Sequence, residues 1–170
     1  MCGAALPNKE ISLVYHKEIL QQLDSIIPAP AAISVQEAIF SRDNLKLQKL
    51  IQDLLMQSAS SFDTAGENFY HGFMAGLLVN IGGYLVRSNR ESGNGRPDIV
   101  MTESKFRGRA MILELKISDT IQGMEKKCEE ALTQIEEQKY ESSLEEDCFQ
   151  PILKYAICFF RKRCMVKKAE

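Results

Sequence analysis

Two short apolar stretches near the middle of the chain, 98–103 and 110–117, carry charged residues that a core strand should lack. Their β-forming residues predict two strands, and the polar, glycine-containing segment between them predicts a hairpin. Successive side chains of a strand point to opposite faces, so Glu114 and Lys116 share one face of the sheet. Asp98 opens the first strand and can lie across the hairpin from both. The pattern therefore gathers two carboxylates and an amine at one place.

Two interpretations fit these charges. A Glu-x-Lys pattern inside a strand occurs often by chance and usually lies on a solvated sheet face. A carboxylate and an amine that are buried together are costly unless they pair or bind something. Such oxygen ligands suit a hard cation, because Mg²⁺ and Mn²⁺ take one or two carboxylates. Zinc fits poorly, since the chain has two histidines and no paired thiolates.

The same patterning outlines the remaining elements and two regions of the chain. Apolar residues at helical spacing predict helices at 8–23, 34–40, 45–58, 67–81 and 121–140. Apolar runs between turn signals predict further strands at 84–88, 152–160 and 164–166, with 141–147 as a loop. Strands mixed with helices indicate the α/β class. We expect residues 1–62 to form an N-terminal helical extension packed on the core, and residues 63–170 to form the main domain.

Charge is segregated along the chain, although its net value is only −2. Residues 85–116 and 151–170 are basic, whereas residues 117–150 carry three Lys or Arg against ten Asp or Glu. The small net charge argues against a protein that coats nucleic acid, and any one cluster is ordinarily a solvated surface. Basic segments on both sides of the proposed site nevertheless suit a phosphate-bearing substrate. Scattered cysteines, no long apolar run and no leader predict a cytoplasmic protein.

These residues resemble a known family. Pro97-Asp98, a hairpin and then Glu114-Leu115-Lys116 resemble the signature of the PD-(D/E)XK nuclease superfamily. Blocks at 67–78, 88–99 and 131–140 resemble a bacterial branch whose nuclease-like domain usually follows an ATPase-like domain. The resemblance covers residues 67–166 and implies a restriction-endonuclease-like α-β-β-β-α-β core with a mixed central sheet. Because the chain contains no P-loop motif, the ATPase-like domain is expected to be missing or to be a partner of the N-terminal helices.

The resemblance also implies a role for each residue of the site. Asp98, Glu114 and the backbone carbonyl of Leu115 would bind Mg²⁺ or Mn²⁺. Lys116 would orient the attacking water and stabilise the charge that develops in the transition state. Gln134 matches the family's helix glutamine, although the residues alone would place it on a helix surface.

Two residues of the preceding helix have competing interpretations. Glu67 resembles the family's first-helix glutamate, which belongs to the site, but it also completes a capping box with Thr64. His71 lies one helical turn later on the same face. It can hydrogen-bond Glu67 or fill the core.

Basic residues around the predicted hairpin and turns are candidate contacts to a nucleic-acid backbone: Arg96, Lys105, Arg107, Arg109, Arg161, Lys162 and Arg163. Arg96 can alternatively pair with Asp98. The last three lie in a turn where the resembled family usually has a glycine, so this chain adds charge there without changing the site.

We therefore predict a cytoplasmic, metal-dependent nuclease that hydrolyses phosphodiester bonds of nucleic acid, with DNA as the expected substrate. The alternative is a catalytically silent domain of the same fold that binds nucleic acid or protein, a role that the acidic helix at 121–140 would suit. A small-molecule phosphodiesterase ranks below both, because nothing marks a nucleoside pocket. A homodimer is left open, and no membrane partner is expected.

Overall fold

A mixed five-stranded sheet lies at the centre of the computed structural model, which describes residues 29–58, 66–88 and 95–169 of the 170-residue chain. The strands lie in the order β1-β2-β3-β4-β5, with β3 and β4 parallel and the other neighbours antiparallel. Their bounds are Tyr84–Ser88 for β1, Ile99–Glu103 for β2, Ala110–Ile117 for β3, Ile152–Phe160 for β4 and Arg163–Lys168 for β5.

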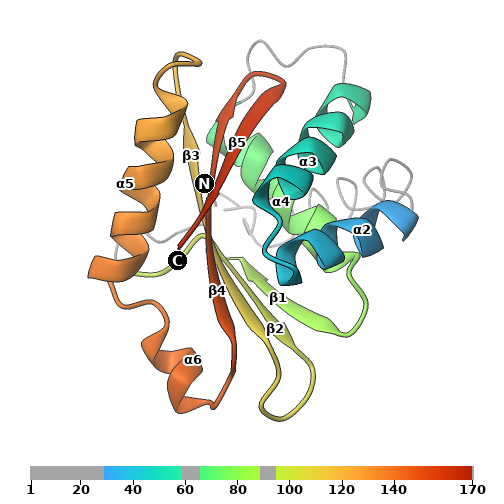
Figure 1. Ribbon diagram of the computed structural model, residues 1–170, viewed down its shortest axis with the longest axis vertical. Helices are drawn as coiled ribbons and strands as arrows, with labels where there is room; N and C mark the ends of the chain where they lie inside the picture. The colour runs from blue at the N-terminus through green and yellow to red at the C-terminus, as the bar shows by residue number, and fades with distance from the viewer. Residues whose placement is uncertain (1–28, 59–65, 89–94, 170) are drawn as a thin grey trace, which may run out of the picture.

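Helices cover both faces of this sheet (Figure 1). The first face carries α2 (Ala29–Phe40), α3 (Asn44–Ser58) and α4 (Glu67–Val79). The second carries α5 (Met124–Glu137) and α6 (Ser142–Glu146), which link β3 to its parallel neighbour β4. The order α4-β1-β2-β3-α5-β4 confirms the predicted α-β-β-β-α-β core.

One hydrophobic cluster joins the described N-terminal helices to the sheet. Val35 of α2 and Ile51 of α3 are fully buried in the same cluster as Leu113 of β3 and Phe159 of β4. Burial of this apolar surface is the main force that holds the helices in place. These helices therefore share their core with the strands, while the division of the chain near residue 62 stays a prediction.

Side chains of α3 also protect the outer edge of the sheet. Gln48 Oε1 accepts a hydrogen bond from the Val166 amide at 3.0 Å, and Asn44 Nδ2 donates to the Val166 carbonyl at 3.3 Å. An uncovered edge strand exposes such backbone groups to pairing with another chain. At Val166 of β5, α3 takes the place of a sixth strand.

The structure corrects several predicted boundaries. The predicted loop 141–147 contains the helix α6, which forms because Leu144 is buried against Ile112 and Tyr140. The helix expected at 34–40 begins earlier, at Ala29, since Pro30 is tolerated in a first helical turn. The helix expected at 121–140 is shorter, at Met124–Glu137, and the last strand is longer than expected. The helix predicted at 8–23 lies outside the described residues.

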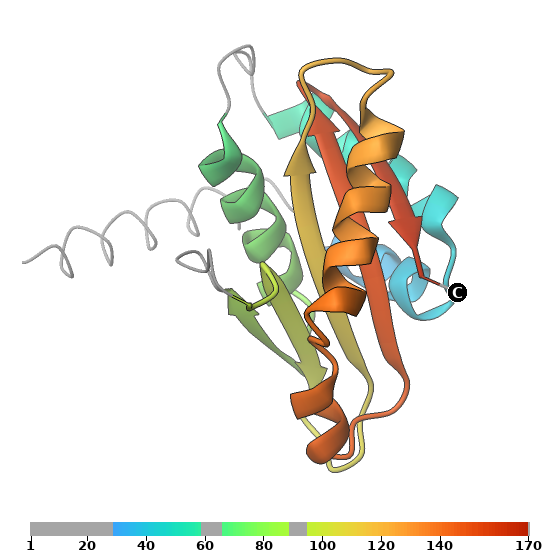
Figure 2. The same cartoon turned by 90° about the vertical axis from the view of Figure 1, so that its left-hand side faces the viewer.

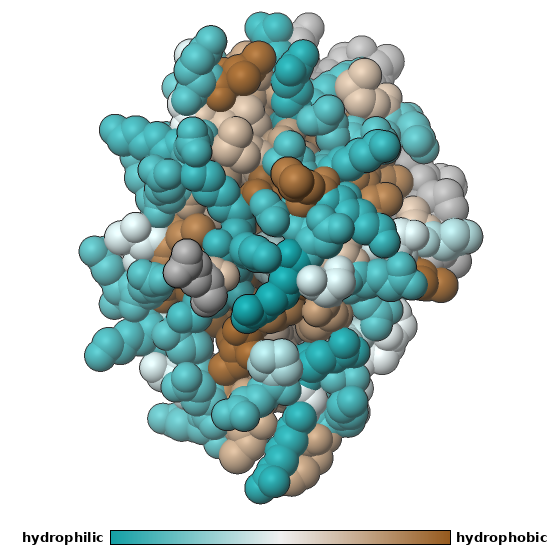
Figure 3. All heavy atoms as spheres, in the orientation of Figure 1, coloured by the Kyte–Doolittle hydropathy of each residue, from teal (hydrophilic) through white to brown (hydrophobic). Residues whose placement is uncertain are grey.

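The face of the molecule in Figure 3 is largely hydrophilic, and its hydrophobic areas are small and separated. No helix in the part of the chain that the structure describes is long and apolar enough to cross a membrane.

Candidate functional site

The site lies where β3 extends beyond its neighbour β2. The pairing of these strands reaches Ile99 and Leu113, whereas β3 pairs with β4 as far as Ile117. Asp98 immediately precedes β2 and accepts a hydrogen bond from the Leu115 amide through Oδ2, at 2.7 Å. The carboxylate of Asp98 thus takes the place of a strand partner at this point of β3. This is where α4 and α5 lie on either side of β3 (Figure 2).

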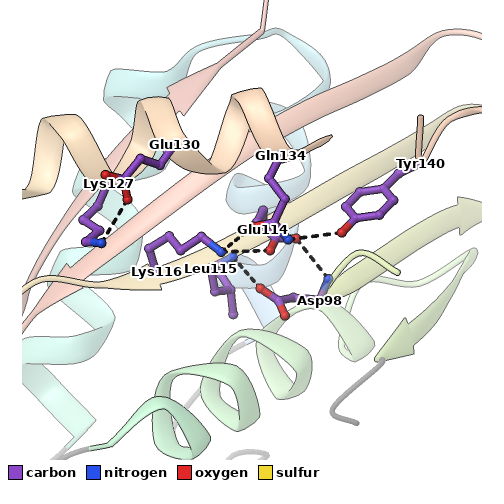
Figure 4. A network of polar contacts seen from close by, with 8 residues as sticks. All are labelled: Asp98, Glu114, Leu115, Lys116, Lys127, Glu130, Gln134 and Tyr140. Carbon is purple, nitrogen blue, oxygen red and sulfur yellow. Dashed lines mark hydrogen bonds and ion pairs between the residues drawn. The ribbon is translucent and has the colours of Figure 1, made fainter. Parts of the chain in front are cut away.

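The three charged residues predicted from the sequence come together here (Figure 4). Lys116 Nζ donates to Glu114 Oε1 at 3.1 Å, and the Asp98 amide lies 3.4 Å from Glu114 Oε2. The Glu114 side chain is 3% exposed and that of Lys116 is 26% exposed. The solvated-face interpretation of this Glu-x-Lys pattern is therefore wrong, because α5 covers the face that carries it.

Both carboxyl groups sit in surroundings that disfavour a negative charge. Burial raises the pKa of Asp98, although the Leu115 amide and the Lys116 charge act in the opposite direction. Burial also raises the pKa of Glu114, and the nearby charge of Asp98 raises it further. A divalent cation between them would favour the ionised forms, because an opposite charge at short range offsets desolvation. The pair is therefore compatible with a bound divalent cation.

Gln134 approaches the site from α5, in agreement with its predicted position. Its Oε1 accepts a hydrogen bond from Lys116 Nζ at 2.7 Å. Its Nε2 donates to the Tyr140 hydroxyl at 3.1 Å. Tyr140 matched a block of the resembled family, but no pattern in the sequence indicated its contact with Gln134. The structure makes it the outer end of a chain of contacts that runs through Gln134 and Lys116 to Glu114 (Figure 4).

Glu67 is the first residue of α4, and the capping-box interpretation of this residue is wrong. Gly66 is the N-cap and makes no side-chain capping bond, so Glu67 occupies the first helical position rather than the third. Thr64 lies outside the described residues. Glu67 is exposed and close enough to Asp98 for its charge to raise the pKa of that carboxyl group. This proximity favours the site interpretation.

His71 contacts the site through the backbone of Asp98. Its Nε2 lies 3.2 Å from the Asp98 carbonyl oxygen, and its ring nitrogens lie 3.4–3.5 Å from Ser88 Oγ. His71 is 7% exposed and contacts these groups rather than Glu67. It therefore holds the start of β2 against α4.

The residues at hand can hold one hard cation. The described part of the chain has no group of three or more His, Cys, Asp or Glu arranged to hold a metal ion. Magnesium needs fewer protein ligands than this, since it usually keeps several waters and takes one or two carboxylates. Asp98 and Glu114 match that requirement, whereas a tetrahedral zinc site would lack ligands.

The seven basic candidates do not form one surface. Lys105, Arg107 and Arg109 lie in or beside the hairpin between β2 and β3. The β4–β5 turn, formed by residues 161–162, lies at the opposite end of the molecule (Figure 1), and Arg163, predicted to lie in this turn, is the first residue of β5. Arg96 is exposed and forms no ion pair with Asp98 or another described residue.

The guanidinium group of Arg109 makes contacts within the protein that stabilise the fold. Its guanidinium group pairs with Glu103 at 3.3 Å, donates to the Tyr84 hydroxyl at 2.6 Å and lies 4.2 Å from the centre of the Phe40 ring. These contacts tie the hairpin to β1 and α2, which leaves little of Arg109 for a nucleic-acid backbone.

Comparison with known proteins agrees with this geometry. A family model described as the PD-(D/E)XK nuclease superfamily matches residues 65–169, well over half of the chain. No curated protein matched. The matched region spans the helix, strands and polar cluster that form the site, in a restriction-endonuclease-like arrangement. The chain thus belongs to the PD-(D/E)XK nuclease superfamily.

Proposed function

We propose that this protein is a divalent-metal-dependent nuclease in which Asp98, Glu114 and Lys116 carry out phosphodiester hydrolysis. The observation that supports the proposal best is the position of the Lys116 ammonium group. It lies between Glu114 Oε1 at 3.1 Å and Gln134 Oε1 at 2.7 Å, beside the paired carboxylates of the site. Family membership supports nuclease-like chemistry, with nucleic acid as the substrate class.

Asp98, Glu114 and the Leu115 carbonyl would hold Mg²⁺ or Mn²⁺. Such an ion, when bound, neutralises the charge of a phosphate and lowers the pKa of a coordinated water. Glu67 of α4 would add a further negative charge near Asp98, which strengthens attraction for a cation. His71 and the Leu115 amide keep Asp98 in position from two directions.

Lys116 would act on the attacking water and on the transition state. An ammonium group has three donors, and Glu114 and Gln134 accept two of them. The third is left for the water or for a phosphate oxygen as negative charge develops there. Because its two partners fix the ammonium group beforehand, little reorganisation is needed during the reaction.

A cleavage assay tests this proposal. Single- and double-stranded DNA and RNA are incubated with Mg²⁺ or Mn²⁺ and with wild type or Lys116→Ala. Loss of one preorganised electrostatic group predicts a rate at least about a hundredfold lower in Lys116→Ala. Lys167→Ala is the matched control, since Lys167 is 28% exposed against 26% for Lys116 and pairs with Glu125 and Glu129 at 2.8 and 2.9 Å, on β5, two strands away from β3.

The outcome separates the proposal from its main alternative. Cleavage that survives EDTA, or that is equal in wild type and Lys116→Ala, would show that these residues do not carry the reaction. Wild type that binds nucleic acid yet cuts none of the four substrate forms would instead support a catalytically silent binding domain.

A further inference from the structure

The hairpin tip between β2 and β3 (residues 104–108) has Phe106 as its most prominent feature. The Phe106 side chain is 82% exposed, more than any other large hydrophobic side chain in the described residues. Single exposed apolar residues are common on proteins, so exposure alone does not indicate a binding surface. The hydrogen bonds and charges around Phe106 at the hairpin tip do indicate one.

The base of the hairpin is held rigidly. The Glu103 amide donates to the Arg109 carbonyl at 2.8 Å, and the Gly108 amide donates to the Lys105 carbonyl at 3.1 Å. Glu103 pairs with Lys105 at 3.0 Å and with Arg109 at 3.3 Å. A Cβ on Gly108 would lie 2.7 Å from the Glu103 Cβ, so only glycine fits there. Phe106 is thus carried on a fixed support.

Arg107 lies beside the Phe106 ring at the hairpin tip. Its backbone has a φ of 55°, in the left-handed region that bulky residues rarely adopt. In this conformation its guanidinium carbon lies 5.2 Å from the centre of the Phe106 ring. Lys105 and Arg109 both pair with Glu103, whereas Arg107 has no carboxylate partner among the described residues.

We propose that Phe106 and Arg107 bind a single strand of nucleic acid, with one base stacked on the Phe106 ring and a neighbouring phosphate on Arg107. The inference rests on the proposed function, because the charge and the family point to nucleic acid as the polyanion. An exposed aromatic ring beside an uncompensated cation is the combination that binds unpaired bases. A base in a duplex is already stacked on its neighbours and gains less.

The hairpin tip lies within reach of a strand that occupies the site. Glu114 lies five positions after Arg109, the residue just before β3, which corresponds to roughly 17 Å at about 3.4 Å per strand residue. This is about five phosphates at a spacing of about 3.4 Å per nucleotide, and fewer in an extended strand. A strand cut at the site can therefore be held by Phe106 several nucleotides away.

The chain contains no tryptophan, which gives a direct test. Phe106→Trp in the full chain places a single fluorophore at the tip, and titration with an unlabelled single strand in EDTA avoids cleavage. Stacking of a base on the indole should quench its fluorescence to saturation, more strongly for a single strand than for its blunt duplex. Leu85→Trp on β1, where Leu85 is 57% exposed, is the control and should not be quenched.

Affinity measured by anisotropy with labelled strands gives the second readout. Phe106→Ala should weaken single-strand binding roughly five- to one-hundredfold, the range found when one stacking aromatic is removed. Arg107→Gln should lower the slope of log affinity against log salt by about 0.7, because one phosphate contact is lost. DNA and RNA strands are tested in parallel, and quenching by either supports the stacking assignment.

Several results would overturn the inference. The first is absence of quenching by both DNA and RNA, and the second is equal quenching by duplex and single strand. The third is quenching or a spectral shift that follows protein concentration, which would indicate that a second copy of the chain binds this surface. The two proposals fail separately. Quenching without any cleavage would support the binding surface and contradict the nuclease proposal. Cleavage without quenching would support the nuclease proposal and contradict the binding surface.

Discussion

The Tyr140 hydroxyl holds the far end of the Gln134 amide, whose orientation is set by the Lys116 ammonium because an ammonium group only donates. The hydroxyl accepts a hydrogen bond from Gln134 Nε2, and Gln134 Oε1 accepts one from Lys116. An amide turned the other way would place its donor group against the ammonium, which repels it. Tyr140 therefore positions Lys116 through Gln134 without contacting the reacting atoms.

Removal of this hydroxyl by Tyr140→Phe should lower kcat about tenfold and leave the melting temperature within a few degrees of wild type, since one hydrogen bond contributes about 1 kcal/mol. The measurement is kcat in single and double variants. In a Gln134→Ala background, Tyr140→Phe should have no further effect, because the two act as one unit.

Tyr155→Phe is the matched control for this prediction. The Tyr155 hydroxyl donates to the Ile39 carbonyl at 2.7 Å, on the sheet face opposite Glu114 and Lys116, so its loss should lower stability but not kcat. Additive effects of Tyr140→Phe and Gln134→Ala on kcat would show that Tyr140 does not act through Gln134.

The residues of the site differed in how far the sequence could predict them. Asp98, Glu114 and Lys116 follow from strand periodicity, which fixes side-chain direction locally. Tyr140 does not follow from periodicity, because it lies beyond the end of α5. The chain reverses direction at Lys139, which adopts a φ of 50°, and the Tyr140 amide lies 3.4 Å from the Ile135 carbonyl oxygen. This reversal brings Tyr140 back to the end of α5. No local pattern marks such a reversal.

The β2–β3 hairpin is stabilised by one carboxylate. Hydrogen bonds from the Arg109 amide, and from the side chains of Lys105 and Arg109, lower the pKa of Glu103 to about 2 from an ordinary value of 4.5. A depressed pKa in the folded state means that the ionised group stabilises the fold above about pH 4.5. That contribution is lost as the pH falls from about 4.5 towards 2.

Glu103→Gln should therefore be less stable than wild type at pH 7, by about 1–2 kcal/mol for a hydrogen-bonded charge. The difference should shrink as the pH falls from about 4.5 towards 2. Urea unfolding at a series of pH values measures it. Glu37→Gln is the control, since its exposed pair with Lys46 at 3.5 Å should contribute little. A constant difference between Glu103→Gln and wild type across this range would contradict the assignment.

Element boundaries were predicted well where burial follows a simple period. The strand Ile152–Phe160 was predicted to the residue, because its apolar run lies between clear turn signals. The short helix α6 was missed, since its burial depends on one side chain, Leu144. The N-cap of α4 was predicted at Thr64 but lies at Gly66, because Glu67 three residues after Thr64 imitates a capping box.

At the scale of the whole molecule, the matched family region and the hydrophobic core have different extents. The family model begins at residue 65, whereas the buried cluster includes α2 and α3. Gln48 and Asn44 of α3 also satisfy backbone groups of the edge strand β5. Periodicity could predict these helices but not where they pack, because contacts between residues more than a hundred positions apart leave no local pattern.

This shared core makes a prediction about cooperativity. Ile51→Ala removes a fully buried side chain of α3 and should lower the free energy of unfolding by about 2–5 kcal/mol. If α3 and the sheet unfold together, circular dichroism and tyrosine fluorescence should report one coincident transition, shifted as much as in Leu153→Ala of β4. An early helical transition in Ile51→Ala, with the transition of the sheet unchanged, would show instead that the N-terminal helices form a separate unit. Coincident transitions would mean that the site rests on a fold larger than its family signature, because the strand order that brings Asp98 to Glu114 would depend on helices outside the matched region.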